Sequence, residues 1–190
     1  MRSSRAYSRY QLSDVANGLG YLHSCSVIHG DLKGVRSCSK SYFTVILTPD
    51  QSNVVMDGSG IARLADFGLA TVTLNLDSVR SATNQRGFTP RWAAPEILDE
   101  GTYSKEADVF SFAMVMIEVY TGAIPFSGST ISMAILAITQ GRHPPRPTHP
   151  TFTEKLWKLM QRCWNRDPHL RPEISEALQV LLTPSVSRSF

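Results

Sequence analysis

Two carboxylates and one amine could together carry out phosphoryl transfer. Asp31 and Lys33 stand in the string His29-Gly30-Asp31-Leu32-Lys33, and Asp66 begins the string Asp66-Phe67-Gly68. Phosphoryl transfer needs a carboxylate beside the attacking hydroxyl, a second carboxylate on magnesium and a cation against the phosphate charge. Asp31, Asp66 and Lys33 are the candidates for these three roles.

The sequence around these strings predicts the elements that position them. Residues 9–24 are predicted as an amphipathic helix, because apolar side chains recur at three- and four-residue steps, at Leu12, Val15, Leu19 and Leu22. Apolar runs at 45–48 and 61–65 predict strands of small antiparallel ribbons, separated by turn-rich residues at 49–53 and 57–60. Asp31 then lies in a loop after a helix, and Asp66 leaves the end of a strand.

Downstream of these strings the pattern is mainly helical. Residues 109–120 have almost no polar face, which predicts a helix buried on all sides. Further helices are predicted over 131–138, after the capping box of Thr151 and Glu154, and from Pro172 to near Pro184. Residues 69–93 lack sustained periodicity and are predicted to form a mobile surface segment.

Length and composition limit the class of protein. The 190 residues suffice for one substantial core, and a net charge of +3 spread along the chain gives no indication of nucleic-acid binding. Three cysteines, an odd number without metal-ligand spacing, favour an intracellular and cytoplasmic location. The apolar run at 109–120 is too short for a bilayer, so we expect no membrane segment.

Together with Ala94-Pro95-Glu96, the two strings resemble the catalytic loop, metal-binding loop and activation-segment end of a eukaryotic protein kinase. The resemblance covers about residues 9–182, and its nearest form is the tyrosine-kinase-like group of serine/threonine kinases, with a loop version often seen in fungal sequences. It implies a protein-kinase-like α+β fold. That fold would be mainly the α-helical C-terminal lobe with small β-ribbons, without the N-terminal β lobe, over residues 1–183, with a short tail at 184–190.

The resemblance also implies a role for each candidate residue. Asp31 would accept the hydroxyl proton, Lys33 would stabilise the transferring phosphate, and Asp66 would hold Mg²⁺. Leu47 and Asp66 would contact ATP. The acceptor would be serine or threonine of a protein substrate, because Lys33 differs from the loop of tyrosine-specific relatives.

A second set of residues would support the catalytic loop and the activation segment. His29 would pack inside and orient the loop, while Asp108 would accept hydrogen bonds from its backbone; a simple helix-start carboxylate is the alternative for Asp108. Thr89 would contact both the base and the lysine. A buried ion pair would join Glu96 and Arg171, since a desolvated charge requires its partner. The full set is His29, Phe67, Gly68, Thr89, Glu96, Asp108 and Arg171.

Three features depart from the family pattern. Relatives place a metal-binding asparagine five residues after the catalytic aspartate, and this position is Arg36, a cation of the wrong sign for a magnesium site. Asp31 and Asp66 lie 35 residues apart, beyond the usual interval, so we interpret residues 36–44 as an insertion. The residues ahead of the catalytic loop contain no glycine-rich phosphate loop, no Val-Ala-Ile-Lys strand and no partner glutamate.

The sequence therefore predicts an ATP- and Mg²⁺-dependent serine/threonine kinase whose small lobe is missing and whose chain is inactive by itself. Two alternatives stay open. A pseudokinase-like interaction module is favoured by Arg36 and the insertion, and an unstable fragment would expose the adenine-facing surface near Leu47. Oligomeric state, upstream regulator and substrate are left open.

Overall fold

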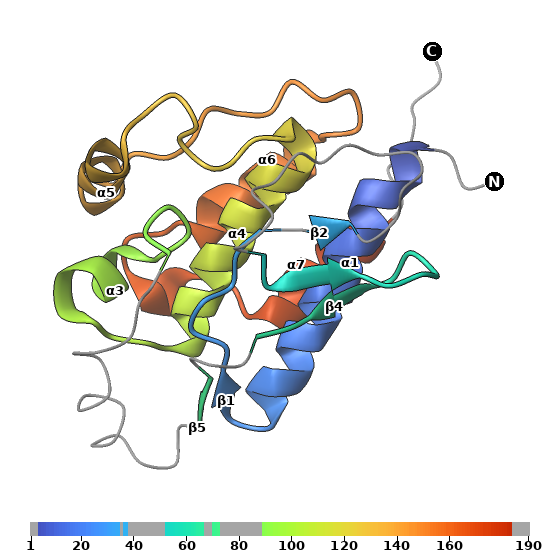
Figure 1. Ribbon diagram of the computed structural model, residues 1–190, viewed down its shortest axis with the longest axis horizontal. Coiled ribbons are helices and arrows are strands. Elements are labelled where there is room, and N and C mark those ends of the chain that lie inside the picture. The colour runs from blue at the N-terminus through green and yellow to red at the C-terminus, as the bar shows by residue number, and fades with distance from the viewer. Residues whose placement is uncertain (1–3, 35, 38–51, 67–69, 73–88, 184–190) are drawn as a thin grey trace.

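A computed structural model describes residues 4–34, 36–37, 52–66, 70–72 and 89–183 (Figure 1). The helices are α1 (Ser4–Ser24), α3 (Pro95–Glu100), α4 (Lys105–Thr121), α5 (Ile131–Thr139), α6 (Glu154–Cys163), the 3-10 helix η3 (Pro168–Leu170) and α7 (Ile174–Leu182). The strands are β1 (Val27–Ile28), β2 (Arg36–Ser37), β3 (Val54–Met56), β4 (Ala62–Leu64) and β5 (Thr71–Val72). Helices dominate the described part of the chain.

Helix α4 lies at the centre of the core. Ser104 caps the N-terminus of α4, because its hydroxyl accepts a hydrogen bond from the Ala107 amide. Gly122 caps the C-terminus with a left-handed φ of 67°. Side chains on every face of α4 are buried, and α1 and α6 both pack against it (Figure 1). This confirms the prediction of a helix buried on all sides, which follows because no face of the segment is polar.

The first and last helices of the described chain are joined directly. Helix α1 packs along α7, and the Arg9 guanidinium donates to the carbonyls of Leu181 and Thr183 at 2.6 and 2.5 Å. These carbonyls lie at the C-terminal end of α7, where the helix dipole favours a cation. The predicted helix over 9–24 is confirmed, and it continues back to Ser4. No described helix has both the length and the apolar character needed to cross a bilayer.

The strands form two small ribbons that border the candidate catalytic loop. Strand β1 pairs antiparallel with β5, and β3 pairs antiparallel with β4 and parallel with β2. The strand predicted at 61–65 is confirmed as β4, whereas the run at 45–48 lies outside the described residues. The hairpin partner of β4 is β3, a strand of three residues. The sequence patterns do not predict β3, because so short a run shows no periodicity.

Candidate active site

The Asp31 carboxylate lies in the loop after β1 and contacts three side chains. Lys33 Nζ is 2.6 Å from Asp31 Oδ2, and Asn53 Nδ2 donates to the same oxygen at 3.1 Å. Thr89 Oγ1 donates to Asp31 Oδ1 at 3.0 Å. The Asp31 and Lys33 side chains are only 10% and 14% exposed. These contacts hold the carboxylate in one orientation, as a base that must meet an incoming hydroxyl requires.

Asp108 fixes the backbone of the catalytic loop. Its carboxylate oxygens accept hydrogen bonds from the His29 and Gly30 amides, each at 2.9 Å, and one of them is 2.9 Å from His23 Nε2. Asp108 lies in the first turn of α4 and is 2% exposed. Asp108 is thus a carboxylate in the first turn of α4 that also accepts hydrogen bonds from the backbone of the loop.

His29 lies in the interior beneath the loop. The residue is fully buried, and its Nδ1 accepts a hydrogen bond from the Asp31 amide at 3.3 Å. This is the packing position that the resemblance implied. His29 orients the backbone of Asp31 and does not reach toward solvent, where a substrate would approach.

Asn53, which the sequence patterns did not single out, contacts Asp31. Its side-chain amide donates to the carbonyl oxygen of Asp31 at 2.7 Å as well as to the carboxylate, and the residue is 2% exposed. Counting five residues along the chain from Asp31 led to Arg36, which instead lies in β2. A signal was present in the sequence, since Asn53 directly precedes the apolar run that forms β3.

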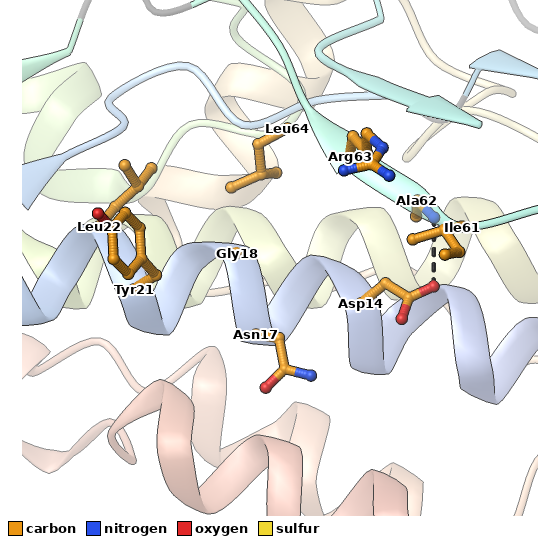
Figure 2. Close-up of a pocket in the computed structure, with 9 residues that line it drawn as sticks. All are labelled: Asp14, Asn17, Gly18, Tyr21, Leu22, Ile61, Ala62, Arg63 and Leu64. Carbon is orange, nitrogen blue, oxygen red and sulfur yellow. Dashed lines mark hydrogen bonds between the residues drawn. The ribbon is translucent and has the colours of Figure 1, made fainter. Parts of the chain in front are cut away.

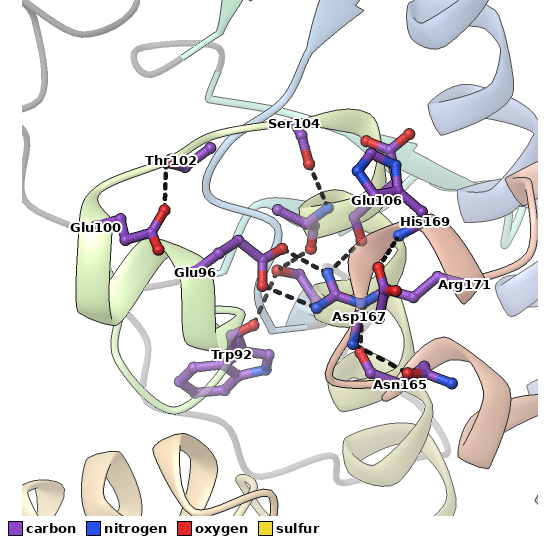
Figure 3. Close-up of polar contacts among 12 residues, drawn as sticks. Trp92, Glu96, Glu100, Thr102, Ser104, Glu106, Asn165, Asp167, His169 and Arg171 are labelled. Atoms are coloured by element: carbon purple, nitrogen blue, oxygen red, sulfur yellow. Dashed lines mark hydrogen bonds and ion pairs between the residues drawn. The ribbon is translucent and has the colours of Figure 1, made fainter.

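Glu96 and Arg171 form a buried, two-pronged ion pair (Figure 3). Arg171 Nη1 and Nη2 donate to the two Glu96 carboxylate oxygens at 2.5 and 2.8 Å. The same guanidinium donates to the backbone carbonyls of Asn165 and Glu106 at 2.8 and 3.0 Å. The Arg171 side chain is fully buried. The Arg171 guanidinium thus connects α3 to the segment that precedes α7.

A second buried carboxylate, Glu118 of α4, links the catalytic loop to the segment before α3. Trp92 Nε1 donates to Glu118 Oε2 at 3.0 Å, and the Gly34 amide also donates to this carboxylate. Burial outweighs these hydrogen bonds and raises the pKa of Glu118 from 4.5 to about 7. Glu118 therefore takes up a proton near neutral pH without leaving the core.

We expect the protonation of Glu118 to make the free energy of unfolding pH-dependent. The folded state keeps this proton up to a pKa of about 7, whereas the unfolded chain releases it near 4.5. Stability should therefore fall as pH rises between these values, by an amount on the order of 3 kcal/mol. Urea unfolding of the Glu118→Gln variant from pH 4.5 to 7.5 should lack this fall.

The matched control for Glu118 is Glu100→Gln, at an exposed carboxylate at the end of α3. Its pH profile should follow that of the unsubstituted protein. A Glu118→Gln profile parallel to the unsubstituted one would show that this carboxyl keeps the same pKa in the folded and unfolded states.

Asp66 lies two residues beyond β4 and is exposed, with a left-handed φ of 58°. Such a φ is uncommon outside glycine, and aspartate is among the residues that adopt it most readily. Leu47, Phe67 and Gly68 lie outside the described residues. Within the described ranges no cluster of three or more His, Cys, Asp or Glu side chains could hold a metal ion.

A surface cavity of about 440 Å³ lies between α1 and β4 (Figure 2). Tyr21 and Leu64 give it apolar walls, and Asp14 closes one end by accepting a hydrogen bond from the Ala62 amide at 3.2 Å. None of the residues that contact the Asp31 carboxylate lines it. The cavity and the Asp31 cluster are therefore separate features.

Known proteins are similar in sequence to nearly the whole of this chain. Residues 6–181 match the family described as protein tyrosine and serine/threonine kinase. The chain is 36% identical over 171 residues to the serine/threonine-protein kinase STY17 of Arabidopsis thaliana, which covers 88% of this chain and 26% of STY17. Similarity extends to the serine/threonine/tyrosine-protein kinase HT1 of the same plant, at 32% identity over 88% of this chain and 37% of HT1.

A further relative comes from Dictyostelium discoideum. The dual specificity protein kinase pyk3 is 33% identical over 90% of this chain and 11% of its own length. The chain thus spans between about a tenth and about a third of the length of these curated relatives. Because the family match covers most of the 190 residues, the chain belongs to the protein tyrosine and serine/threonine kinase family.

Proposed function

We propose that this chain carries the catalytic loop of a protein serine/threonine kinase and acts in phosphoryl transfer from ATP to a protein hydroxyl. The observation that supports this is the convergence of Lys33, Asn53 and Thr89 on the Asp31 carboxylate. These side chains come from three separate parts of the chain, and a turn-forming aspartate would need none of them.

In this proposal each residue of the cluster has one task. Asp31 accepts the proton of the attacking hydroxyl, while Asn53 and Thr89 hold its carboxylate in position. Lys33, whose ammonium is next to that carboxylate, lies where it can contact the transferring phosphate. The proposal is supported by a carboxylate and an ammonium group at one place, because phosphoryl transfer uses a base and a cation together.

The donor set near Asp31 suits a hard cation such as Mg²⁺, which prefers oxygen ligands. Asn53 turns its amide nitrogen toward Asp31, so its Oδ1 is the oxygen that it can offer, and the exposed Asp66 adds a carboxylate. Bound Mg²⁺ would neutralise charge on the phosphates of ATP. We propose that Asn53 and Asp66 hold the ion, and that Leu47 lies on the nucleotide side.

In this reading residues 1–183 are the C-terminal lobe of a kinase domain and 184–190 a tail, in an intracellular protein. The 190 residues contain no glycine-rich phosphate loop and no Val-Ala-Ile-Lys strand, so by themselves they should not turn over ATP. This lack also favours the alternative, an interaction module without catalysis. In the sequence this alternative is favoured by Arg36 and the insertion, and Arg36 carries less weight because the Asn53 side chain donates to the Asp31 carboxylate.

The proposed function predicts the choice of acceptor. We expect the chain, fused behind the ATP-binding lobe of a well-expressed serine/threonine kinase, to phosphorylate serine and threonine peptides at least about 100-fold faster than tyrosine peptides. The reason is that Lys33 and Thr89, at which the chain resembles serine/threonine kinases, both contact Asp31. Transfer of radiolabelled phosphate to three matched peptides measures this.

Two results would contradict parts of the proposal. Comparable transfer to the tyrosine peptide would show dual specificity, as the printed names of HT1 and pyk3 describe those relatives. No transfer to any peptide, from a fusion that folds and binds ATP, would favour the interaction module.

A further inference from the structure

The backbone on either side of residues 35–51 comes together at one point. A Cβ atom added to Gly34 would lie 3.0 Å from the Cα of Ser52 and 2.7 Å from its Oγ. Seventeen residues separate Gly34 from Ser52 in the sequence. The backbones of Gly34 and Ser52 are therefore in close contact, although the two residues are far apart in the sequence.

A backbone hydrogen bond joins the residues on the two sides of 35–51. The Asn53 amide donates to the Lys33 carbonyl at 2.9 Å. If Ser52 followed Gly34 directly, this bond would join the first and fourth residues of a four-residue segment, as in a β-turn. Gly34 would be the second residue, where hairpin-type turns require a positive φ, and its φ is 55°.

The partners that hold these four residues lie outside 35–51. The Gly34 amide donates to Glu118, and the Asn53 carbonyl accepts from the Ala65 amide at 2.8 Å. The Asn53 side chain binds Asp31, as described above. Every one of these contacts stays available when residues 35–51 are removed.

The described part of 35–51 contributes one short pairing. Arg36 and Ser37 form β2, which pairs in parallel with Val55 and Met56 at one edge of β3. The other edge of β3 pairs with β4 and does not involve β2. Removing β2 therefore leaves the β3–β4 hairpin that follows Asn53.

We propose that residues 35–51 are an insertion within a β-turn of the catalytic loop, and that a chain in which Gly34 is joined to Ser52 keeps the fold and the Asp31–Asn53 contact. The boundaries differ from the 36–44 expected from the sequence, because the flanks that meet are Gly34 and Ser52. The interval between Asp31 and Asp66 shortens by the same 17 residues. This inference does not depend on catalysis, since it concerns which residues the fold needs.

Thermal unfolding of three proteins tests the proposal. They are the unsubstituted chain, the deletion of 35–51, and a chain in which 35–51 is replaced by 17 glycines and serines. We expect the deletion to unfold cooperatively with a Tm about 5 °C above that of the unsubstituted chain, because a two-residue connection costs less closure entropy than a long one. The glycine-serine chain should melt within about 2 °C of the unsubstituted chain.

A glycine pair shows whether the deleted chain forms the proposed turn. In the deletion background Gly34→Ala should lower the Tm by several degrees, since the proposed turn keeps the positive φ of Gly34, which alanine disfavours. Gly58→Ala is the control, because nothing lies within 4 Å of its added Cβ. Equal effects of the two substitutions would contradict the turn.

The remaining outcomes also decide the proposal. A deletion that melts below the unsubstituted chain, while the glycine-serine chain does not, would show that the fold needs the spacing. Loss of the transition in both altered chains would show that it needs the sequence of 35–51. Absence of a cooperative transition in the deletion, with soluble yield no higher than that of the unsubstituted chain, overturns the proposal as well.

Discussion

Replacing Asp31 with asparagine should lower the rate of phosphoryl transfer by about 1,000-fold in a fusion that carries an ATP-binding lobe, within the range that a positioned general base contributes. The substituted amide keeps the size of the carboxylate, and its oxygen can still accept from Thr89 Oγ1, which donates at 3.0 Å. It cannot take up the hydroxyl proton. The loss should therefore appear in kcat and leave KM for the peptide little changed.

Steady-state rates with a serine peptide, together with the Tm of each protein, measure this effect. Asp99→Asn is the matched control, because Asp99 is an exposed carboxylate of α3. It should keep the full rate. An Asp31→Asn protein that retains its Tm and more than about a tenth of the rate would rule out Asp31 as the base.

Substitution of Arg171 by methionine should destabilise the chain by about 3–5 kcal/mol, the usual cost of removing one partner from a buried ion pair. Methionine fills much of the same volume but leaves Glu96 without its cation. It also removes the donors to the carbonyls of Asn165 and Glu106. Urea unfolding of the full chain gives the change in free energy.

The surface pair of Arg162 and Glu176 supplies a close control. Its two hydrogen bonds, at 2.5 and 3.0 Å, are about as short as those of the buried pair. The Arg162 and Glu176 side chains are 51% and 48% exposed, so Arg162→Met should cost at most about 1 kcal/mol. Equal losses from the two methionine substitutions would show that burial does not set the strength of the Glu96–Arg171 pair.

A double substitution separates the two origins of the expected loss. Glu96→Gln combined with Arg171→Met removes both charges, so the chain should recover part of the stability that Arg171→Met alone takes away. No recovery would assign the loss to the carbonyls of Asn165 and Glu106, which lose the Arg171 donor in both proteins.

Much of the fold follows from local patterns. The sequence of α4 predicts its burial, because the segment has no polar face. The sequence of α1 predicts a helix, because its apolar residues recur at three- and four-residue steps. Lys33 and Asp31 are two residues apart, so the family motif itself brings them into contact. Such features depend on residues close in the chain, where covalent geometry limits what neighbours can do.

The contacts that complete the candidate site are long-range. Asn53 reaches Asp31 across 22 residues, Thr89 across 58, and Asp108 binds the Gly30 amide across 78. Arg36 stands five residues after Asp31, whereas the asparagine that contacts Asp31 stands 22 residues after it. The position of a residue in the sequence does not identify its spatial neighbour when a long segment of chain lies between the two residues in contact.

The sequence by itself determined the family, the residue types of the catalytic motif and most of the helices, since these depend on short strings and local periodicity. Tertiary structure alone decided which asparagine meets Asp31, what the carboxylate of Glu118 binds, and where the chain closes around residues 35–51. The physical reason is that buried polar groups must find partners wherever the packed core places them, whatever their distance along the chain.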